Sequence, residues 1–95
     1  MDKTRNLPLS RIELDGEYDL SQKEVLASLF GALRADGPVT IDLTNVTYID
    51  STFLNALAAL RGRVNGHPIT LLGANATILR VLRLVGFDRL FHLAE

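Results

Sequence analysis

Two hydroxyl side chains and a carboxylate stand together near the middle of this chain, at Asp50-Ser51-Thr52. An apolar, β-branched stretch precedes them and an amphipathic helical pattern follows, so these residues are predicted to lie where a helix begins. The first N–H groups of a helix have no partner within it, and the helix dipole favours negative charge there. A phosphate added to Ser51 or Thr52 would therefore be held by the fold and visible to a partner.

A simpler interpretation of the same residues is a helix cap. Ser, Thr and Asp side chains all accept a hydrogen bond from an N–H of the first turn, which is the usual reason for finding them at a helix start. Considered alone, Asp50-Ser51-Thr52 indicates a cap, a phosphoacceptor or a helix start at which a ligand docks.

Other chemistry finds little support in the sequence. The two histidines, His67 and His92, are far apart in the chain and have no evident base partners or metal ligands beside them. Gly73 follows a predicted strand but lacks the spacing of a phosphate-binding loop, and no Gly-x-Ser-x-Gly elbow surrounds Ser51. The absence of cysteine excludes disulfides and thiolate metal sites. We therefore expect no enzyme, no metal site and no cofactor of the chain's own.

The composition is that of one small globular domain. The chain has 95 residues, of which 47% are hydrophobic and 22% charged, with a formal net charge of −1. This charge gives no support for nucleic-acid binding, which needs clustered basic side chains. No apolar run reaches the roughly 18 residues of a membrane span, and the N-terminus does not resemble a signal peptide. We expect a cytoplasmic protein with no direct membrane insertion, a flexible N-terminus at residues 1–8 and one domain at residues 9–95.

Arginines concentrate in the C-terminal half of the chain. We interpret them first as solvated helix faces and second as a surface for an acidic partner. They are Arg61, Arg63, Arg80, Arg83 and Arg89.

The first half of the chain predicts a strand, a helix and a second strand. Residues 9–14 alternate apolar and polar side chains, as in a half-buried strand, and Asp15-Gly16 predicts a turn. Asp19 or Ser21 is expected to cap a first helix, Ser21 through a capping box with Glu24, and this helix should end near residue 34. Residues 39–43 predict a short buried strand, which a turn at residues 44–45 closes.

The second half predicts two more helices and two more strands. The second helix should carry one apolar face and end at residues 65–66. That face comprises Phe53, Leu54, Leu57, Leu60 and Val64. Residues 69–72 predict a strand, Asn75 or Thr77 the cap of a third helix that ends at Gly86, and residues 90–93 a last strand. The resulting β-α-β-α-β-α-β order predicts an α/β fold, with a small, mostly parallel sheet and helices packed on it.

This layout and four local strings resemble the STAS domain (sulfate transporter and anti-sigma factor antagonist) over roughly residues 9–93. The strings are similar to the family's turn after the early strand, its central strand, its apolar-Asp-Ser-Ser/Thr-Gly signature, and its last helix with the closing strand. In order they are Gly16-Glu17-Tyr18-Asp19, Ile41-Asp42-Leu43, Tyr48-Ile49-Asp50-Ser51-Thr52, and Leu82-x3-Gly86-Phe87 followed by Leu90-Phe91. The resemblance implies a STAS-like fold.

The resemblance also implies a function. In stand-alone family members of the anti-sigma antagonist kind, a partner serine/threonine kinase that is also the anti-sigma factor phosphorylates the second hydroxyl of the signature. That position is Thr52 here, with Ser51 as the second choice, and ATP and magnesium would belong to the partner's reaction. The unphosphorylated protein would bind the kinase through the start of the second helix and the turn before the first. The implied contact residues are Asp15, Gly16, Glu17, Asp19, Asp50, Ser51, Thr52 and Phe53.

The sequence departs from the family signature at Phe53, where the family has glycine. The spacing of Phe53 to Leu57 and Leu60 favours an ordinary core residue of the second helix, whereas a surface position would add bulk where a kinase must approach. This departure keeps a second function open. Other stand-alone STAS proteins are unphosphorylated subunits of membrane transporters, such as lipid-transport ATP-binding cassette (ABC) complexes, in which the domain docks on the ATPase.

Overall fold

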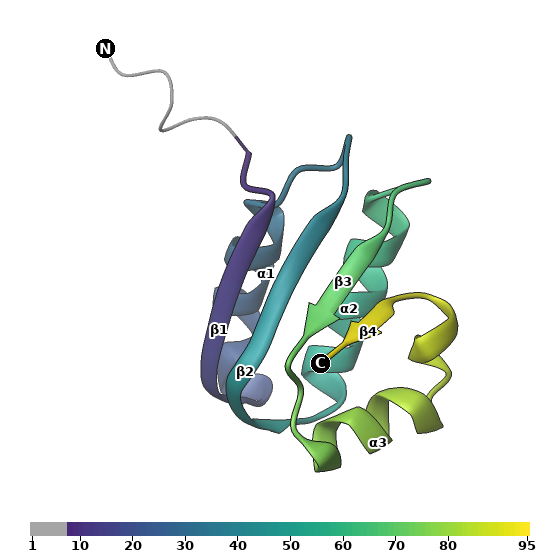
Figure 1. The fold of residues 1–95 in the computed structure, drawn as a ribbon. Helices are drawn as coiled ribbons and strands as arrows, with labels where there is room; N and C mark the ends of the chain where they lie inside the picture. Colours follow the sequence, from purple (N-terminus) through teal and green to yellow (C-terminus); the bar gives the residue numbers. More distant parts are fainter. Residues whose placement is uncertain (1–7) are drawn as a thin grey trace.

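The computed structural model describes residues 8–95, which form a four-stranded sheet with helices packed against it (Figure 1). The strands are β1 (Arg11–Tyr18), β2 (Val39–Ile49), β3 (Ile69–Leu72) and β4 (His92–Ala94). They lie side by side in that order and all run parallel. The helices are α1 (Lys23–Gly31), α2 (Ser51–Arg63) and α3 (Ala76–Leu84), with the short 3-10 helices η2 (Leu20–Gln22) and η3 (Phe87–Arg89). The predicted α/β class and alternating order are confirmed.

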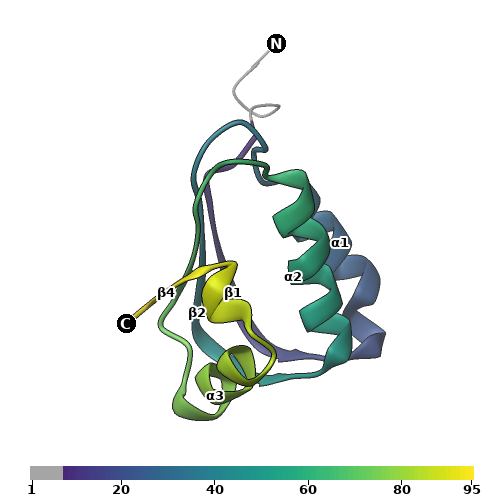
Figure 2. The same cartoon turned by 90° about the vertical axis from the view of Figure 1, so that its right-hand side faces the viewer.

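The helices cover the sheet unevenly. Helices α1 and α2 lie side by side over one face, whereas α3 lies at the end of the sheet towards which the strands run (Figure 2). Side chains that point from the strands towards α1 and α2 are buried, and the intervening ones are exposed or half-buried. The buried strand residues include Ile12, Leu14, Val39, Ile41, Leu43, Ile69 and Leu71. This alternation is the period-two pattern from which the strands were predicted.

Strand β1 continues through the residues that were expected to turn. Asp15-Gly16 is not a turn, because both residues stay paired with β2, opposite Asn45 and Val46. The pairing register shifts between Glu13 and Asp15, and again after Gly16, which has a positive φ of 81°. Glycine adopts this conformation without the steric cost of a Cβ. The glycine therefore bends the strand at an irregularity rather than ending it.

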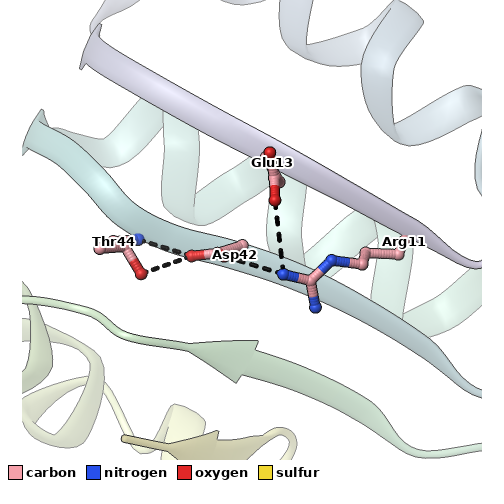
Figure 3. A network of polar contacts seen from close by, with 4 residues as sticks. All are labelled: Arg11, Glu13, Asp42 and Thr44. Atoms are coloured by element: carbon pink, nitrogen blue, oxygen red, sulfur yellow. Dashed lines mark hydrogen bonds and ion pairs between the residues drawn. The ribbon is translucent and has the colours of Figure 1, made fainter.

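Strand β2 is likewise longer than expected, because the chain bulges at Leu43-Thr44 and continues through Asn45 instead of turning at Thr44-Asn45. Glu13 pairs with Asp42, whereas Asp15 pairs with Asn45, so β2 has one more residue than β1 between these two pairs. The Asp42 carboxylate accepts hydrogen bonds from the Thr44 N–H (2.9 Å) and hydroxyl (2.6 Å), and from Arg11 of β1 (2.9 Å) (Figure 3). Asp42 thereby stabilises the bulge locally and ties it to the neighbouring strand.

The first helical segment begins at Asp19, one of the two predicted caps, and ends earlier than predicted. Asp19 caps it by accepting a hydrogen bond from the Ser21 N–H, so the capping box from Ser21 to Glu24 does not form. Helix α1 ends at Gly31 rather than near residue 34. Beyond it, the Arg63 guanidinium of α2 donates to the carbonyls of Phe30 (2.6 Å) and Leu33 (2.9 Å). A contact from a distant helix thus satisfies carbonyls at this helix end, and no local pattern could indicate it.

The C-terminal part follows the predicted order with small changes. Asn75 caps α3 by accepting from the Ile78 N–H (2.9 Å), which decides between the two expected caps. Gly86 has a φ of 81° just after α3, as expected for a residue that ends a helix. The last strand is His92–Ala94 rather than residues 90–93, because Phe91 turns into the core.

The expected flexible N-terminus at residues 1–8 falls almost wholly outside the described residues. Leu9, expected to begin the first strand, instead makes an isolated bridge to Leu33. Its N–H donates to the Ala32 carbonyl (2.8 Å) and its carbonyl accepts from the Arg34 N–H (2.7 Å). The segment before β1 is therefore tied to the end of α1.

Candidate functional site

Two acidic helix caps lie next to each other where β1 and β2 end. Tyr18 and Ile49 are paired at the ends of these strands, and the next residue in each case is an aspartate, Asp19 or Asp50. Asp19 accepts from the Ser21 N–H (2.9 Å), and Asp50 accepts from the Thr52 N–H (2.8 Å). Both aspartates have extended backbones and accept from the residue two positions on. Paired strands are about 4.8 Å apart, so Asp19 and Asp50 follow neighbouring strand ends. Their two carboxylates give this corner of the molecule negative charge.

Hydrogen bonds from Ser21 stabilise the ionised form of Asp19. The Ser21 hydroxyl contributes most and the Ser21 N–H next, and together they hold the pKa of Asp19 below its ordinary value of 3.8. Both bonds are made to the carboxylate, which is why they favour the charged form. Asp19 is therefore ionised at neutral pH.

Ser51 and Thr52 occupy the first turn of α2, as predicted. The Ser51 side chain is exposed and Thr52 is half-buried, and both line a surface groove of about 630 Å³ between α1 and α2. The Asp50 cap therefore does not remove the two hydroxyls from the surface. It fixes the backbone that carries them and leaves them at the groove.

Small side chains form much of the wall of this groove, which we call the α1/α2 groove. They are Ala27, Gly31, Ala56 and Ala59. Leu20, which is 70% exposed, and the α1 residue Lys23 line it together with Ser51 and Thr52. A chain segment could approach both helix backbones closely at the four positions with small side chains, whereas Phe30, Leu60 and Arg63 line other parts of the groove. Leu20, Lys23 and Asn55 also line this groove, and no pattern in the sequence predicted a role for them.

Phe53 does not belong to the exposed surface. It has no exposed area and its ring lies 5.7 Å from that of Tyr18 and 6.1 Å from that of Phe30, measured between centroids. The expectation that Phe53 contacts a partner is therefore wrong, and its interpretation as a core residue of the second helix is confirmed. The bulk that replaces the family's glycine points inward, so it leaves Ser51 and Thr52 accessible.

The remaining predicted contact residues lie along β1 rather than in a turn. Asp15 and Glu17 are exposed, and Glu17 pairs with Tyr48, which is 50% exposed. The Asp15 N–H donates to the Tyr18 hydroxyl (3.3 Å), and Gly16 lies between the two acidic residues. The structure thus places Asp19, Asp50, Ser51 and Thr52 together at the strand ends, with Asp15 and Glu17 forming an acidic strip that leads to them.

Two of the five C-terminal arginines have structural partners. Besides the contacts of Arg63, Arg61 donates to the carbonyls of Leu90 (3.1 Å) and His67 (2.6 Å), and also to that of Val64. Arg63 is exposed, as expected for a solvated helix face, and Arg61 is half-buried, but both also make contacts that the sequence did not predict. Both side chains satisfy carbonyl groups at helix ends and loops, and Arg63 also lines the α1/α2 groove.

The described part of the chain has neither a cluster of metal-binding side chains nor a helix that could span a membrane. Within residues 8–95 no group of three or more His, Cys, Asp or Glu side chains could hold a metal ion. None of the helices in the same range is both long enough and apolar enough to span a membrane.

Comparison with known proteins identifies the family. The family model described as "Mlab, STAS domain" matches residues 3–94, which is nearly the whole chain. No curated protein matches the sequence. STAS domains are generally non-enzymatic regulatory domains, in keeping with a site built from helix caps, hydroxyls and a groove. With a family match of this length and the parallel α/β fold described above, the chain belongs to the STAS domain family.

Proposed function

We propose that this protein is an anti-sigma factor antagonist-like regulator that binds a serine/threonine kinase anti-sigma factor, and that phosphorylation of Thr52 releases the partner. The partner would contact the start of α2, the Asp19 corner and the α1/α2 groove. The observation that carries the proposal is that Ser51 and Thr52 line this groove while the neighbouring Asp50 fixes their backbone. We propose that this protein and its kinase partner are both located in the cytoplasm.

The charge around Thr52 supports a switch of this kind. Asp50 caps the same helix turn, and Asp19 follows the adjacent strand. A phosphate would add about −1.5 to −2 charges beside these carboxylates. An interface that buries the corner would then have to desolvate several negative groups close together, although the helix dipole and Lys23 in the groove wall would stabilise the phosphate in the free protein. Phosphorylation would thus favour the unbound state.

The test is a binding series at position 52 with a candidate kinase partner. We expect Thr52→Glu to weaken binding about a hundredfold, which corresponds to about 3 kcal/mol. Thr52→Val preserves the shape of threonine without its hydroxyl, so it should bind like the unmodified protein and accept no phosphate. Dissociation constants from calorimetry and intact mass after incubation with the kinase, ATP and magnesium measure the two effects.

Ser51 provides the matched control, because it is the more exposed of the two hydroxyls in the same turn. We expect Ser51→Val to be phosphorylated normally and Ser51→Glu to weaken binding less than Thr52→Glu. A phosphate found on Ser51 alone would move the switch to that residue. Equal binding by Thr52→Glu and the unmodified protein would refute the switch.

The second candidate function is that of an unphosphorylated subunit docked on the ATPase of an ABC transporter. The specific observation in its favour is the small-residue wall of the α1/α2 groove, which suits a permanent, closely packed contact that needs no phosphate. Co-purification followed by mass spectrometry separates the candidates, since one predicts a kinase and a phosphate on Thr52 and the other a cassette ATPase and no phosphate. In the second case, filling the groove with Ala56→Leu should abolish the complex, whereas Thr52→Val should preserve it.

A further inference from the structure

The surface of α3 carries a combination of side chains that the proposed function does not use. Leu84 is 78% exposed, the most exposed of the large apolar side chains among the described residues, and Val85 beside it is 48% exposed. Arg80 and Arg83 also lie on the exposed side of this helix, whose inward side is formed by Ile78 and Leu82. Together with Ala76 and Leu79, these arginines and Leu84 line a shallow hollow of about 370 Å³.

The arginines of this surface have no acidic partner within the part of the chain that the structure describes. Among residues 8–95, every ion pair involves Arg11 or Arg34, and none involves Arg80, Arg83 or Arg89. Asp88 is the one acidic residue in the sequence from α3 through η3. Arg83 lies in the last turn of α3, where a cation is favoured by the helix dipole, but Arg80 is in mid-helix and has no such reason. The guanidinium groups of Arg80 and Arg83 are exposed beside Leu84, and their side chains make no hydrogen bond to any residue between 8 and 95.

We propose that this face of α3 is a second docking surface, which binds an acidic amphipathic helix of a partner protein. Arg80 and Arg83 are three residues apart, so their side chains leave α3 on neighbouring positions of one face, about 5–6 Å apart at Cβ. Glutamates one turn apart on a partner helix have the same spacing, and each carboxylate can accept a forked pair of bonds from one guanidinium. Leucines on the same face of the partner helix would cover Leu84 and enter the hollow.

A protein partner fits this surface better than an anionic membrane. Membrane-binding basic clusters commonly contain about four to eight Lys or Arg residues, whereas α3 contributes two and η3 one. Helix α3 also has nine residues, which gives it a length of roughly 13 Å and a small apolar face to insert into lipid. The residues that line this hollow are not among those that line the α1/α2 groove, so the inference does not require phosphorylation of Thr52.

The experiment uses a fluorescein-labelled synthetic helix of about 18 residues, with glutamates one turn apart on one face and leucines beside them. Fluorescence anisotropy measures its binding to the full chain at about 50 mM and about 300 mM salt. Backbone amide NMR shifts locate the contact. We expect binding that weakens with salt, shifts centred on α3, and at least about a tenfold loss of affinity for Arg83→Glu and for Leu84→Ala. A peptide with glutamines in place of the glutamates should bind at least about tenfold more weakly.

Arg34→Glu is the matched charge control. It changes the net charge by the same amount as Arg83→Glu, but Arg34 pairs with Asp36 just after α1, whose C-terminal end lies at the opposite end of the sheet from α3 (Figure 1). We expect Arg34→Glu and Thr52→Glu to bind the peptide within about twofold of the unmodified chain. The inference fails if the peptide does not bind, if Arg83→Glu and Arg34→Glu behave alike, or if the shifts centre on the α1/α2 groove. It also fails if the chain binds vesicles of phosphatidylcholine and phosphatidylglycerol (7:3) instead of the peptide.

Discussion

At the scale of single residues, Asp50 has two roles at the start of α2. Its carboxylate caps the helix through the Thr52 N–H, and its charge stands beside the hydroxyl that we propose is phosphorylated. A capping aspartate is common at helix starts, so this hydrogen bond alone says nothing about function. The charge becomes relevant because Asp19 and the exposed acidic residues of β1 surround the same corner.

The two roles of Asp50 are separable by substitution. Asp50→Ala removes the cap and should lower the free energy of unfolding by about 1 kcal/mol. Asp50→Asn keeps a side-chain oxygen for the Thr52 N–H and should cost much less, although it removes the charge. Urea denaturation of the three proteins followed by circular dichroism measures the difference. Equal losses for the two variants would show that the charge of Asp50, and not its cap, stabilises α2.

At the scale of elements, the bulge of β2 decides where its exposed side chains lie. Asp42 supports the bulge through the Thr44 hydroxyl and N–H, and Arg11 extends the network to β1 (Figure 3). Beyond the bulge, Val46 and Ile49 turn inward, and the strand reaches Asp50 at the end where β1 reaches Asp19. The irregularity is therefore part of how the two acidic caps come to lie on adjacent strands.

The Asp42 network predicts a particular dependence of stability on pH. Hydrogen bonds from the Thr44 hydroxyl, then from its N–H, and the charge of Arg11 hold the pKa of Asp42 below its ordinary value of 3.8 in the folded protein. A carboxylate with a lowered folded pKa stabilises the fold fully above its unfolded pKa, and this stability is lost as the pH falls towards the folded value.

We therefore expect the unmodified protein to be more stable than Asp42→Asn at neutral pH, and this advantage to shrink as the pH falls below about 4. Thermal unfolding of both proteins between about pH 7 and about pH 2 measures the difference. Glu13→Gln is the control, because Glu13 contacts Arg11 but not Thr44, and it should not reproduce the effect. A stability difference that stays constant across this range would contradict the assignment.

At the scale of the whole molecule, one core joins helices α1, α2 and α3 to the sheet, and Phe53 lies within it. Its ring contacts Tyr18 at the end of β1 and Phe30 near the end of α1, so three elements meet at this side chain. The charges are distributed unequally around this core. The acidic corner lies at the starts of η2 and α2, and α3 lies at the same end of the sheet (Figure 2). Helix α3 carries Arg80 and Arg83, which form no ion pair with any of the residues that the structure describes. A partner approaching this end would be oriented by both surfaces.

The central place of Phe53 predicts a global effect of its removal. Phe53→Ala should lower the free energy of unfolding by about 3–5 kcal/mol, because it leaves a cavity where the three elements meet. Small domains are commonly stable by about 5–15 kcal/mol in total, so the loss is a large share. Urea denaturation followed by tyrosine fluorescence and circular dichroism measures it. Leu84→Ala is the control and should change stability by no more than about 0.5 kcal/mol, since Leu84 is exposed. A loss below about 1 kcal/mol for Phe53→Ala would contradict this role.

The sequence by itself determined the features that local chemistry controls. Alternating apolar residues predicted where the buried parts of the strands lie, helical spacing predicted the inward face of α2 including Phe53, and Asn75 and Gly86 marked the ends of α3. It also put Ser51 and Thr52 in the first turn of a helix. These features depend on residues a few positions apart, which is why periodicity and capping patterns reveal them.

Only the tertiary structure decided the rest. The Asp15-Gly16 and Thr44-Asn45 segments look like turns in the sequence, but pairing between β1 and β2 keeps both within the sheet. The α1/α2 groove depends on how two helices pack on one face, and the partners of Arg61 and Arg63 lie in distant parts of the chain. Cross-strand pairing and helix packing join residues far apart in sequence. The residues of the proposed switch could therefore be named from the sequence, whereas the surface around them could not.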